Sequence, residues 1–228
     1  MSYNLLTHSN AKLDKSHNDD WYVVGLHLAP GNLSGREVCG GRDECFDSCL
    51  NYAGHGGFDR TQQARIRRTK LFFEQRETFM RLLIEDVTRA YGKATLADQR
   101  LAVRLNITSD IPWESIRAGD FENIMAVFPQ VMFYDYTKLF GRKKLPQNYH
   151  LTFSRGSDNT LSVHKALAHG MNVAVVFDTL PAKYYGRPVI NGDEHDLRFL
   201  DPEGCIVGLT PKGPAKKADG TFVLRLQR

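Results

Sequence analysis

The sequence predicts an α/β protein with a parallel sheet and crossover helices, and we expect a partial or full (βα) barrel. Short β-rich runs alternate with segments of helical periodicity along the 228-residue chain. The run 172–177, Asn-Val-Ala-Val-Val-Phe, presents apolar side chains to both faces, as in the interior of a parallel sheet. Polar residues gather directly after several predicted strands, where ligands of such sheets bind. An open doubly wound sheet is the alternative.

The composition is that of a globular protein. Hydrophobic residues make up 42% and charged residues 25%, which excludes a disordered or collagen-like chain. Four cysteines are too few for a disulfide scaffold, and a net charge of +4 does not by itself indicate nucleic acid. We see no transmembrane or signal segment, and therefore expect a cytoplasmic protein with reduced thiols and no membrane partner. Residues 1–20 are expected to form an N-terminal arm, and 21–228 a single α/β domain.

The elements follow one another in a regular order. A strand at 21–28 precedes a Gly-rich loop at 31–57 and a long helix at 61–91. Further strands are expected at 101–107, 131–136, 149–153 and 172–177. A helical crossover broken around Gly119 is expected at 113–128, and a short helix at 160–169. The remaining chain is expected to form short strands and turns at 188–190, 197–200, 205–209 and 222–226, the last closing a sheet edge.

The loop after the first strand holds three of the four cysteines: Cys39, Cys45 and Cys49, in a C-x5-C-x3-C pattern. Thiolates this close in sequence can face one point, and they suit zinc or an iron–sulfur cluster. A closed zinc site needs a fourth ligand, for which His55 and Cys205 are candidates; the alternative is an exchangeable ligand. The alternative is that the cysteines are unrelated small apolar residues and that His55 is solvated.

Polar residues follow the strand predicted at 101–107. Asn106, Thr108, Ser109 and Asp110 lie where its carboxyl end meets a loop. A helix cap explains Asp110 but does not explain Arg104 and Asn106 inside a central strand, where buried polar groups need partners.

The next two predicted strands also end in polar residues, Asp135 and Lys138 after one and Ser154 and Arg155 after the other. We take Asp110, Asp135 and Lys138 as catalytic candidates. The cofactor-binding candidates are Asn106, Thr108, Ser109, Ser154 and Arg155. A surface ion pair is the alternative for Asp135 and Lys138. The carboxylates around His195 suit either a turn or a divalent metal.

Motifs for several common reactions are missing. The sequence has no G-x-x-x-x-G-K-[ST] loop, no G-x-S-x-G elbow, no H-E-x-x-H and no G-x-G-x-x-G after a strand. Ordinary nucleotide hydrolysis, serine hydrolysis and dinucleotide redox chemistry are therefore disfavoured. The basic stretches 65–68, 142–144 and 212–217 either touch phosphates or form a solvated face.

The order of strand, three-cysteine loop, helix and βα units resembles the radical S-adenosylmethionine enzymes. The resemblance implies a partial (βα)6 barrel and a [4Fe–4S] cluster on Cys39, Cys45 and Cys49, whose open iron takes the amino and carboxylate groups of S-adenosylmethionine. Their usual spacing is C-x3-C-x2-C, unlike the spacing here. Their polar motif after the second strand contacts the cofactor's amino group and corresponds to 106–110.

The chain also resembles an uncharacterised family of phage and plasmid proteins over about residues 25 to 225. That resemblance implies a mobile-element origin and one intact domain, and supplies no reaction. It is carried by 103–106, Ser109-Asp110, Trp113-Glu114, Phe128-Pro129, 133–138, 151–154, 173–177, Gly192-Asp193 and 196–198.

Three functional hypotheses follow. The leading one is a radical-SAM-like iron–sulfur enzyme of a phage or plasmid, or a degenerate relative, acting on a nucleic acid or nucleotide. The first alternative is a zinc-stabilised, non-catalytic module that binds nucleic acid or a host protein through Arg67, Arg68, Lys143 and Lys144. The second is a metal-free α/β enzyme that uses Asp110 or Asp135 as acid or base.

Overall fold

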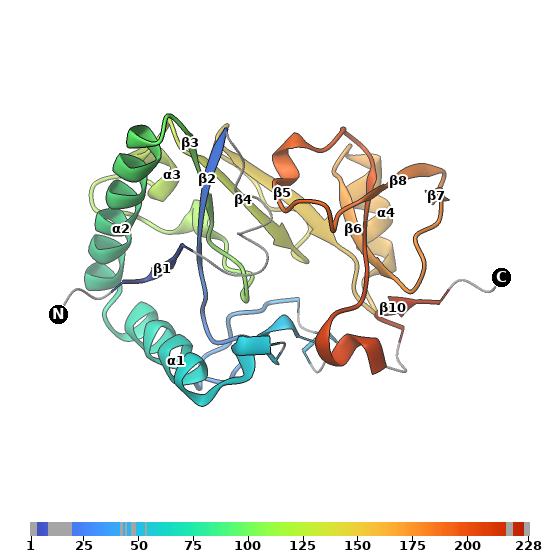
Figure 1. Cartoon of the computed structure of the whole chain (residues 1–228), viewed down its shortest axis with the longest axis horizontal. Coiled ribbons are helices and arrows are strands. Elements are labelled where there is room, and N and C mark those ends of the chain that lie inside the picture. Colours follow the sequence, from blue (N-terminus) through green and yellow to red (C-terminus); the bar gives the residue numbers. More distant parts are fainter. Residues whose placement is uncertain are drawn as a thin grey trace.

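A computed structural model describes residues 4–8, 20–41, 43, 45–46, 49–52, 54–217 and 221–225. Within them, ten strands form one mostly parallel sheet in the order β1-β2-β3-β4-β5-β6-β9-β8-β7, with β10 beside β6 (Figure 1). The strands are β1 (Leu6–Thr7), β2 (Trp21–Leu26), β3 (Arg100–Arg104), β4 (Met132–Thr137), β5 (Tyr149–Ser154), β6 (Val173–Phe177), β7 (Lys183–Tyr184), β8 (Arg187–Asn191), β9 (Ile206–Leu209) and β10 (Val223–Leu224).

The helices connect these strands. The α-helices are α1 (Asp59–Glu74), α2 (Arg76–Leu96), α3 (Ile124–Val127) and α4 (Thr160–Ala168). Short 3-10 turns are η1 (Leu50–Tyr52), η2 (Gly54–Gly57), η3 (Trp113–Ser115), η4 (Arg198–Leu200) and η5 (Gly213–Lys217). Among the described strands, only β1 and β7 pair antiparallel to a neighbour. Mixed α/β architecture with a mostly parallel sheet and crossover helices is therefore confirmed.

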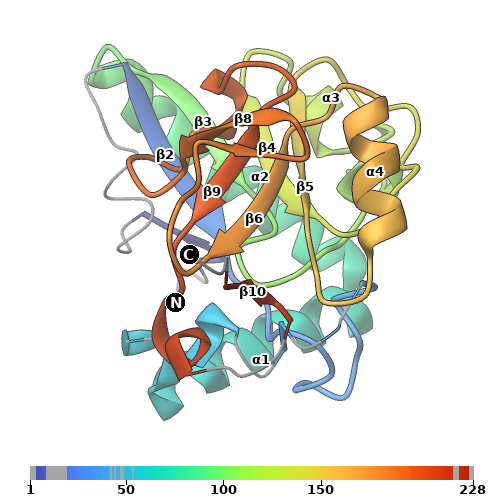
Figure 2. The same ribbon diagram turned by 90° about the vertical axis from the view of Figure 1, so that its right-hand side faces the viewer.

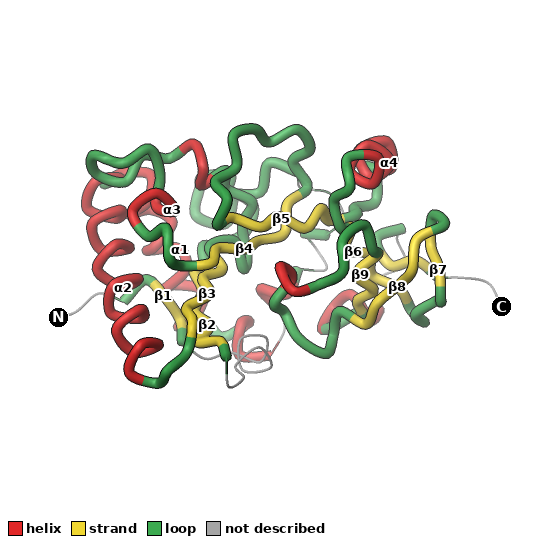
Figure 3. Tube along the Cα trace, turned by 90° about the horizontal axis from the view of Figure 1, so that it is seen from above, coloured by secondary structure: helices red, strands yellow, loops and turns green. Residues whose placement is uncertain are grey.

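The sheet curves but does not close. Seen from above, the strands follow a bend from β2 round to β9 (Figure 3). The strand order ends at β1 on one side and β7 on the other, and these two strands are not paired. A closed barrel is therefore not confirmed; the fold is an open, curved sheet.

The two faces of the sheet differ in what they bury, because successive side chains on a strand point to opposite faces. On the outer face, Leu101, Val103 and Phe133 join one large apolar cluster with α2 residues such as Phe79 and Leu83. On the inner face, a smaller cluster joins strand residues to the segment around η4; it consists of Trp21, Val23, Ala102, Tyr134 and Leu197, with Phe199 packed against it.

Several predicted elements differ in the structure. The helix expected at 61–91 is two helices, because Gln75 leaves the helical region at φ −138° and ψ 60°. The helical crossover expected at 113–128 contains less helix than expected, only η3 and α3, and the expected break at Gly119 (φ +60°) lies between them. The strand expected at 197–200 is the helical turn η4, and that expected at 222–226 pairs beside β6 within the sheet rather than at its edge.

The described part of the first twenty residues adds to the sheet. β1 pairs antiparallel with β2, and the backbone N–H groups of Leu5 and Leu6 both donate to the carboxylate of Asp86 on α2. The other residues of the expected arm, 1–3 and 9–19, lie outside the described residues. In the described part of the chain, no helix combines the length and apolar character needed to cross a membrane.

Candidate functional site

A cavity of about 240 Å3 lies at the carboxyl ends of the parallel strands. In the same measure a single water molecule needs only about 15 Å3, so the cavity has room for a small molecule. The loop after β2 and α1 lie along this end of the sheet (Figure 1, Figure 2). The predicted site residues that line the cavity are Cys39, Cys45, Cys49, Asn106, Thr108, Ser109, Asp110, Lys138 and Ser154.

Cys39 is held by the loop that follows β3. Its neighbour Val38 accepts a hydrogen bond from the Asp110 backbone N–H at 2.7 Å, and Cys39 and Asp110 form a parallel β-bridge. The sulfur accepts from the Gly31 N–H at 3.3 Å and lies 3.9 Å from the Thr108 carbonyl, to which the thiol donates. Burial raises the pKa of the Cys39 thiol to about 12, so the thiol stays protonated at neutral pH.

Cys45 is held by the end of β4 through Asp43. The Cys45 N–H donates to Asp43 Oδ1 at 2.8 Å, and the same carboxylate accepts from Lys138 Nζ at 2.5 Å and from the Ser157 N–H at 3.0 Å. A Cβ at Gly156 would lie 1.8 Å from Asp43 Oδ2, so only glycine permits this approach. The Lys138 pairing with Asp43 lowers the pKa of that carboxyl, although burial opposes the shift.

Cys49 is held by α1. Its sulfur accepts from the Asn51 N–H at 3.4 Å. The Asn51 side chain is in turn fixed on both sides: it donates to Gln62 Oε1 at 3.0 Å and accepts from the buried Arg65 guanidinium. Each cysteine is thus anchored by a different element, while all three line one cavity.

Of the two fourth-ligand candidates, Cys205 does not join the three thiols. Cys205 is fully buried at the amino end of β9, where its N–H donates to Asn172, whereas the cavity lies at the carboxyl ends. The side chain of His55 lies outside what the structure describes. Among the described residues, no three His, Cys, Asp or Glu side chains are grouped to hold a metal ion.

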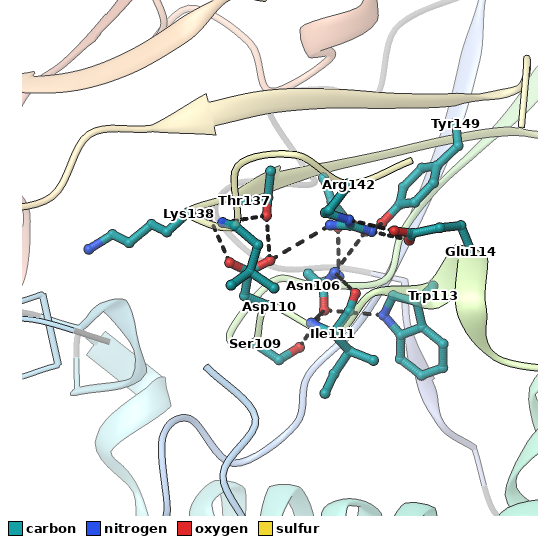
Figure 4. A network of polar contacts seen from close by, with 12 residues as sticks. Asn106, Ser109, Asp110, Ile111, Trp113, Glu114, Thr137, Lys138, Arg142 and Tyr149 are labelled. Atoms are coloured by element: carbon teal, nitrogen blue, oxygen red, sulfur yellow. Dashed lines mark hydrogen bonds and ion pairs between the residues drawn. The ribbon is translucent and has the colours of Figure 1, made fainter. Parts of the chain in front are cut away.

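Asn106 organises the loop after β3 rather than offering groups to a ligand. Its Oδ1 accepts from Ser109 Oγ, the Ile111 N–H and Trp113 Nε1 at 2.8, 2.9 and 3.1 Å (Figure 4). Its Nδ2 donates to the Ile111 carbonyl and to Asp135. All hydrogen-bonding groups of the amide are occupied, so Asn106 fixes the shape of this wall of the cavity.

Asp110 stands between the cavity and a buried ion-pair network (Figure 4). Its carboxylate accepts from Thr137 Oγ1 and the Lys138 N–H, both at 2.8 Å, and lies 3.7 Å from Arg142. Arg142 pairs through two nitrogens with Glu114 and donates to the Tyr149 hydroxyl. Burial raises the pKa of Asp110, against the opposing effect of these donors.

Asp135 lies behind this wall and does not line the cavity. It is fully buried and accepts hydrogen bonds from the Asn106 N–H at 2.6 Å and the Tyr149 hydroxyl at 2.8 Å. Burial raises the pKa of Asp135 to about 7. Neither Asp135 nor Lys138 forms the surface ion pair considered from the sequence, because Asp135 is buried and Lys138 pairs with Asp43.

Of the remaining predicted residues, Thr108 and Ser154 line the cavity and Arg155 does not. Thr108 donates to the Leu28 carbonyl at 2.6 Å and so joins the ends of β2 and β3. Ser154 lines the cavity, but Arg155 is buried behind it and donates to the carbonyls of Thr221 and Phe222 at 2.7 and 3.0 Å. Arg155 therefore fastens the 221–225 segment, which supplies Phe222 to the cavity.

Sequence reasoning missed the far wall of the cavity, which comes from the end of β9 and the segment after it. There Asp193 accepts from the Thr210 N–H and hydroxyl at 2.9 and 2.6 Å and pairs with Lys212 Nζ at 2.5 Å. The Asn-Gly-Asp turn signal at 191–193 marked the turn itself. Lys212 belongs to the basic stretch at 212–217, but no local pattern linked Thr210 or Lys212 to Asp193, which lies 17 and 19 residues away.

Comparison with known proteins identifies the family of the chain. No curated protein and no solved structure matches the chain. A family model described as "Gene product 88" matches residues 4–225, which include every described strand and the whole cavity. The resemblance to phage proteins is thereby confirmed at the level of the family: the chain belongs to the phage-type family Gene product 88.

Proposed function

We propose that the cavity is the active site of a radical-SAM-like enzyme, in which Cys39, Cys45 and Cys49 hold a [4Fe–4S] cluster next to bound S-adenosylmethionine. One observation carries the proposal: three free thiols from the loop after β2 line the same cavity as the polar ends of β3, β4 and β5. When bound, the cluster supplies an electron to S-adenosylmethionine and so starts radical chemistry on a substrate.

The three cysteine thiols are of the chemical type that binds such a cluster. Thiolates are the protein ligands of iron–sulfur clusters, and hydrogen bonds to sulfur tune them. The sulfurs of Cys39 and Cys49 already accept backbone N–H bonds. Lys138 beside Cys45 and Arg65 near Cys49 place positive charge around the loop. The thiols do not yet form a metal site in the described residues, so the loop must draw them together on binding.

The chain's own residues shape and charge the rest of the cavity. Asn106 and Asp110 hold the loop after β3 in place, and Thr108 joins it to the end of β2. Lys138 and Lys212 also line the cavity, each paired with an aspartate, and their ammonium groups suit the carboxylate of an amino-acid-like cofactor. Substrate modification is expected on a nucleotide or nucleic acid, in keeping with the phage-type family.

The two alternatives have less support. A zinc module needs a fourth ligand, and Cys205 lies at the opposite end of its strand from the cavity. A metal-free enzyme would use Asp110, because Asp135 does not reach the cavity. Both carboxylate oxygens of Asp110 already accept hydrogen bonds from β4 and the residue after it.

The test is the metal content of protein purified without oxygen. We expect a brown protein with about four irons per chain. Cys45→Ser should lose the iron, whereas Cys205→Ala, which changes a buried cysteine outside the cavity, should keep it. Circular dichroism confirms that both variants fold.

Other outcomes contradict the proposal in distinct ways. About one zinc per chain would support the zinc module. Protein without either metal would leave the metal-free enzyme, and Asp110→Asn would then be the variant to assay. Iron in the wild type that Cys45→Ser retains would exclude the cysteine loop as its ligand. With iron established, calorimetric titration of S-adenosylmethionine into wild type and Lys138→Met tests the cofactor.

A further inference from the structure

A second cavity, of about 280 Å3, lies beside the β1 edge of the sheet and is separate from the cysteine cavity. Thr7 of β1 and His27, just after β2, form one side. The other side comes from α1 and consists of Arg60, Thr61, Ala64, Arg65 and Arg68. The two cavities share no lining residue.

The α1 side of this cavity presents positive charge by helical spacing. Residues 60, 64 and 68 recur every four positions, as do 61 and 65, so they share one face of the helix. Three of these five side chains are arginines. Among the described residues, no Asp or Glu lines the cavity.

Arg65 is a buried charge whose described partners are uncharged. It is only 7% exposed, and its guanidinium donates to the carbonyl and side-chain oxygens of Asn51, while its Nε is buried without a partner. Burial lowers the pKa of Arg65. A buried cation of this kind is costly unless an anion compensates it.

Arg60 and His27 complete the surroundings. The side chain of Arg60 is exposed and makes no hydrogen bond or ion pair with any described residue. His27 is 7% exposed, and burial together with Arg65, Arg68 and Arg104 lowers its pKa to about 3. His27 is therefore neutral at physiological pH and leaves the arginines as the source of charge.

We infer that this second cavity binds a phosphate group. Guanidinium groups match phosphate oxygens with paired N–H donors, and the Thr7 and Thr61 hydroxyls lie at the same cavity as further donors. The volume exceeds that of a bare ion, so the phosphate of a nucleotide fits as well as free phosphate does. The inference does not require a cluster at the cysteine site, although Arg65 also lies near Cys49.

The test is calorimetric titration of the full chain with inorganic phosphate, in chloride buffer of constant ionic strength. We expect saturable binding by the wild type. Arg60→Gln should weaken it about tenfold, as expected for a lost charge-assisted hydrogen bond. Arg67→Gln is the matched control, because this arginine is exposed on the same helix but does not line the cavity. Its affinity should stay within about twofold of the wild type.

A parallel titration with a nucleoside monophosphate identifies the source of the phosphate. Tighter binding of the nucleotide indicates an ester ligand, and equal or weaker binding indicates free phosphate; both support the site if Arg60→Gln weakens them. Absence of phosphate binding by the folded wild type overturns the inference. Equal losses in Arg60→Gln and Arg67→Gln would do the same, since they would show unspecific attraction to the helix.

Discussion

The outer and inner faces of the curved sheet consist of residues from the same strands, but different interactions stabilise the two faces. On β3 and β4 the outer positions Val103 and Phe133 pack against helices in one large apolar cluster. The inner positions Arg104, Tyr134 and Tyr136 meet charged side chains of the 193–201 segment instead. The outer face is stabilised mainly by apolar area removed from water. The inner face combines a smaller apolar cluster with buried ion pairs, each of which needs both of its partners.

The two faces also differ in how far their stability depends on specific residues that are distant in the sequence. Apolar contacts are non-directional, so any suitable side chain at the right period serves the outer face. The inner pair Arg104–Asp196 joins residues 92 positions apart, and the fully buried Arg198 pairs with Asp201 at 3.2 Å. Each such charge depends on one specific partner.

The largest expected effect is the loss of one member of the inner ion pair. Arg104→Met should lower the free energy of unfolding by about 3–5 kcal/mol, because it leaves the Asp196 carboxylate buried without its arginine. Urea denaturation measures the change. The double variant Arg104→Met/Asp196→Leu should recover most of the loss, since an apolar pair can replace a buried ion pair.

A substitution on the outer face is the control for the recovery of stability in the double variant. Val103→Ala, one position away on β3, should cost roughly 2 kcal/mol through lost burial and a cavity, with no single partner whose removal restores it. Equal stability of Arg104→Met and the double variant would show that Arg104 acts through packing, and would erase the distinction between the faces.

A smaller effect on the free energy of unfolding is expected from Asp135, a carboxylic acid on the otherwise apolar outer face. Its hydrogen-bond donors Asn106 and Tyr149 are neutral, and burial raises its pKa from an ordinary value of about 4 to about 7. The folded protein therefore holds a proton that the unfolded chain releases. The contribution of Asp135 to stability is fully present below pH 4 and is lost as the pH rises through about 7.

Comparison of the wild type with Asp135→Asn isolates this effect. Between about pH 5 and 7 the wild type should lose up to about 1.4 kcal/mol of unfolding free energy per pH unit relative to the variant. Asp201, whose pKa burial raises to about 6, is present in both proteins and cancels in the difference. Parallel stability curves for the two proteins would mean that Asp135 is ionised across this range.

The smallest effect is expected for an ion pair outside both faces. Arg81 and Glu85 on α2 are separated by 2.6 Å, with side chains 63% and 44% exposed. Glu85→Gln should change the free energy of unfolding by less than about 0.5 kcal/mol, because water screens the pair. The same urea titration checks it. A loss of unfolding free energy comparable to that of Arg104→Met would show that burial does not determine how much an ion pair contributes to the stability of this protein.

Much of the fold could be predicted because the outer face follows local periodicity. The strands at β3 to β6 and the helix α4 come from apolar runs that need no knowledge of distant residues. The break at Gln75 could not be predicted, since apolar spacing continues on both sides of it. The turn at η4 looked like a strand because Leu197 and Phe199 alternate with other residues, yet both pack onto the inner face.

The candidate site was predictable for a similar reason. Parallel strands bring their carboxyl ends together, so residues after β3, β4 and β5 were expected to meet, and those at 106, 108–110, 138 and 154 do line one cavity with the cysteines. The partners of the buried Arg104 and Asn106 are Asp196 and Asp135, which only the folded chain reveals. The pairing of Asp43 with Lys138 likewise spans 95 residues and leaves no local signal.

The late position of β10 has a consequence for how the protein is made. β10 lies beside β6, and Phe222, Lys212 and Ala215 complete the cavity from the last described residues. During translation, β2 to β6 can pair while this segment is still inside the ribosome. The cysteine loop is therefore synthesised long before the cavity it faces has its far wall. A premature stop codon directly after β9 would release a chain that retains the cysteine loop and lacks Thr210, Lys212, Ala215 and Phe222 of that wall.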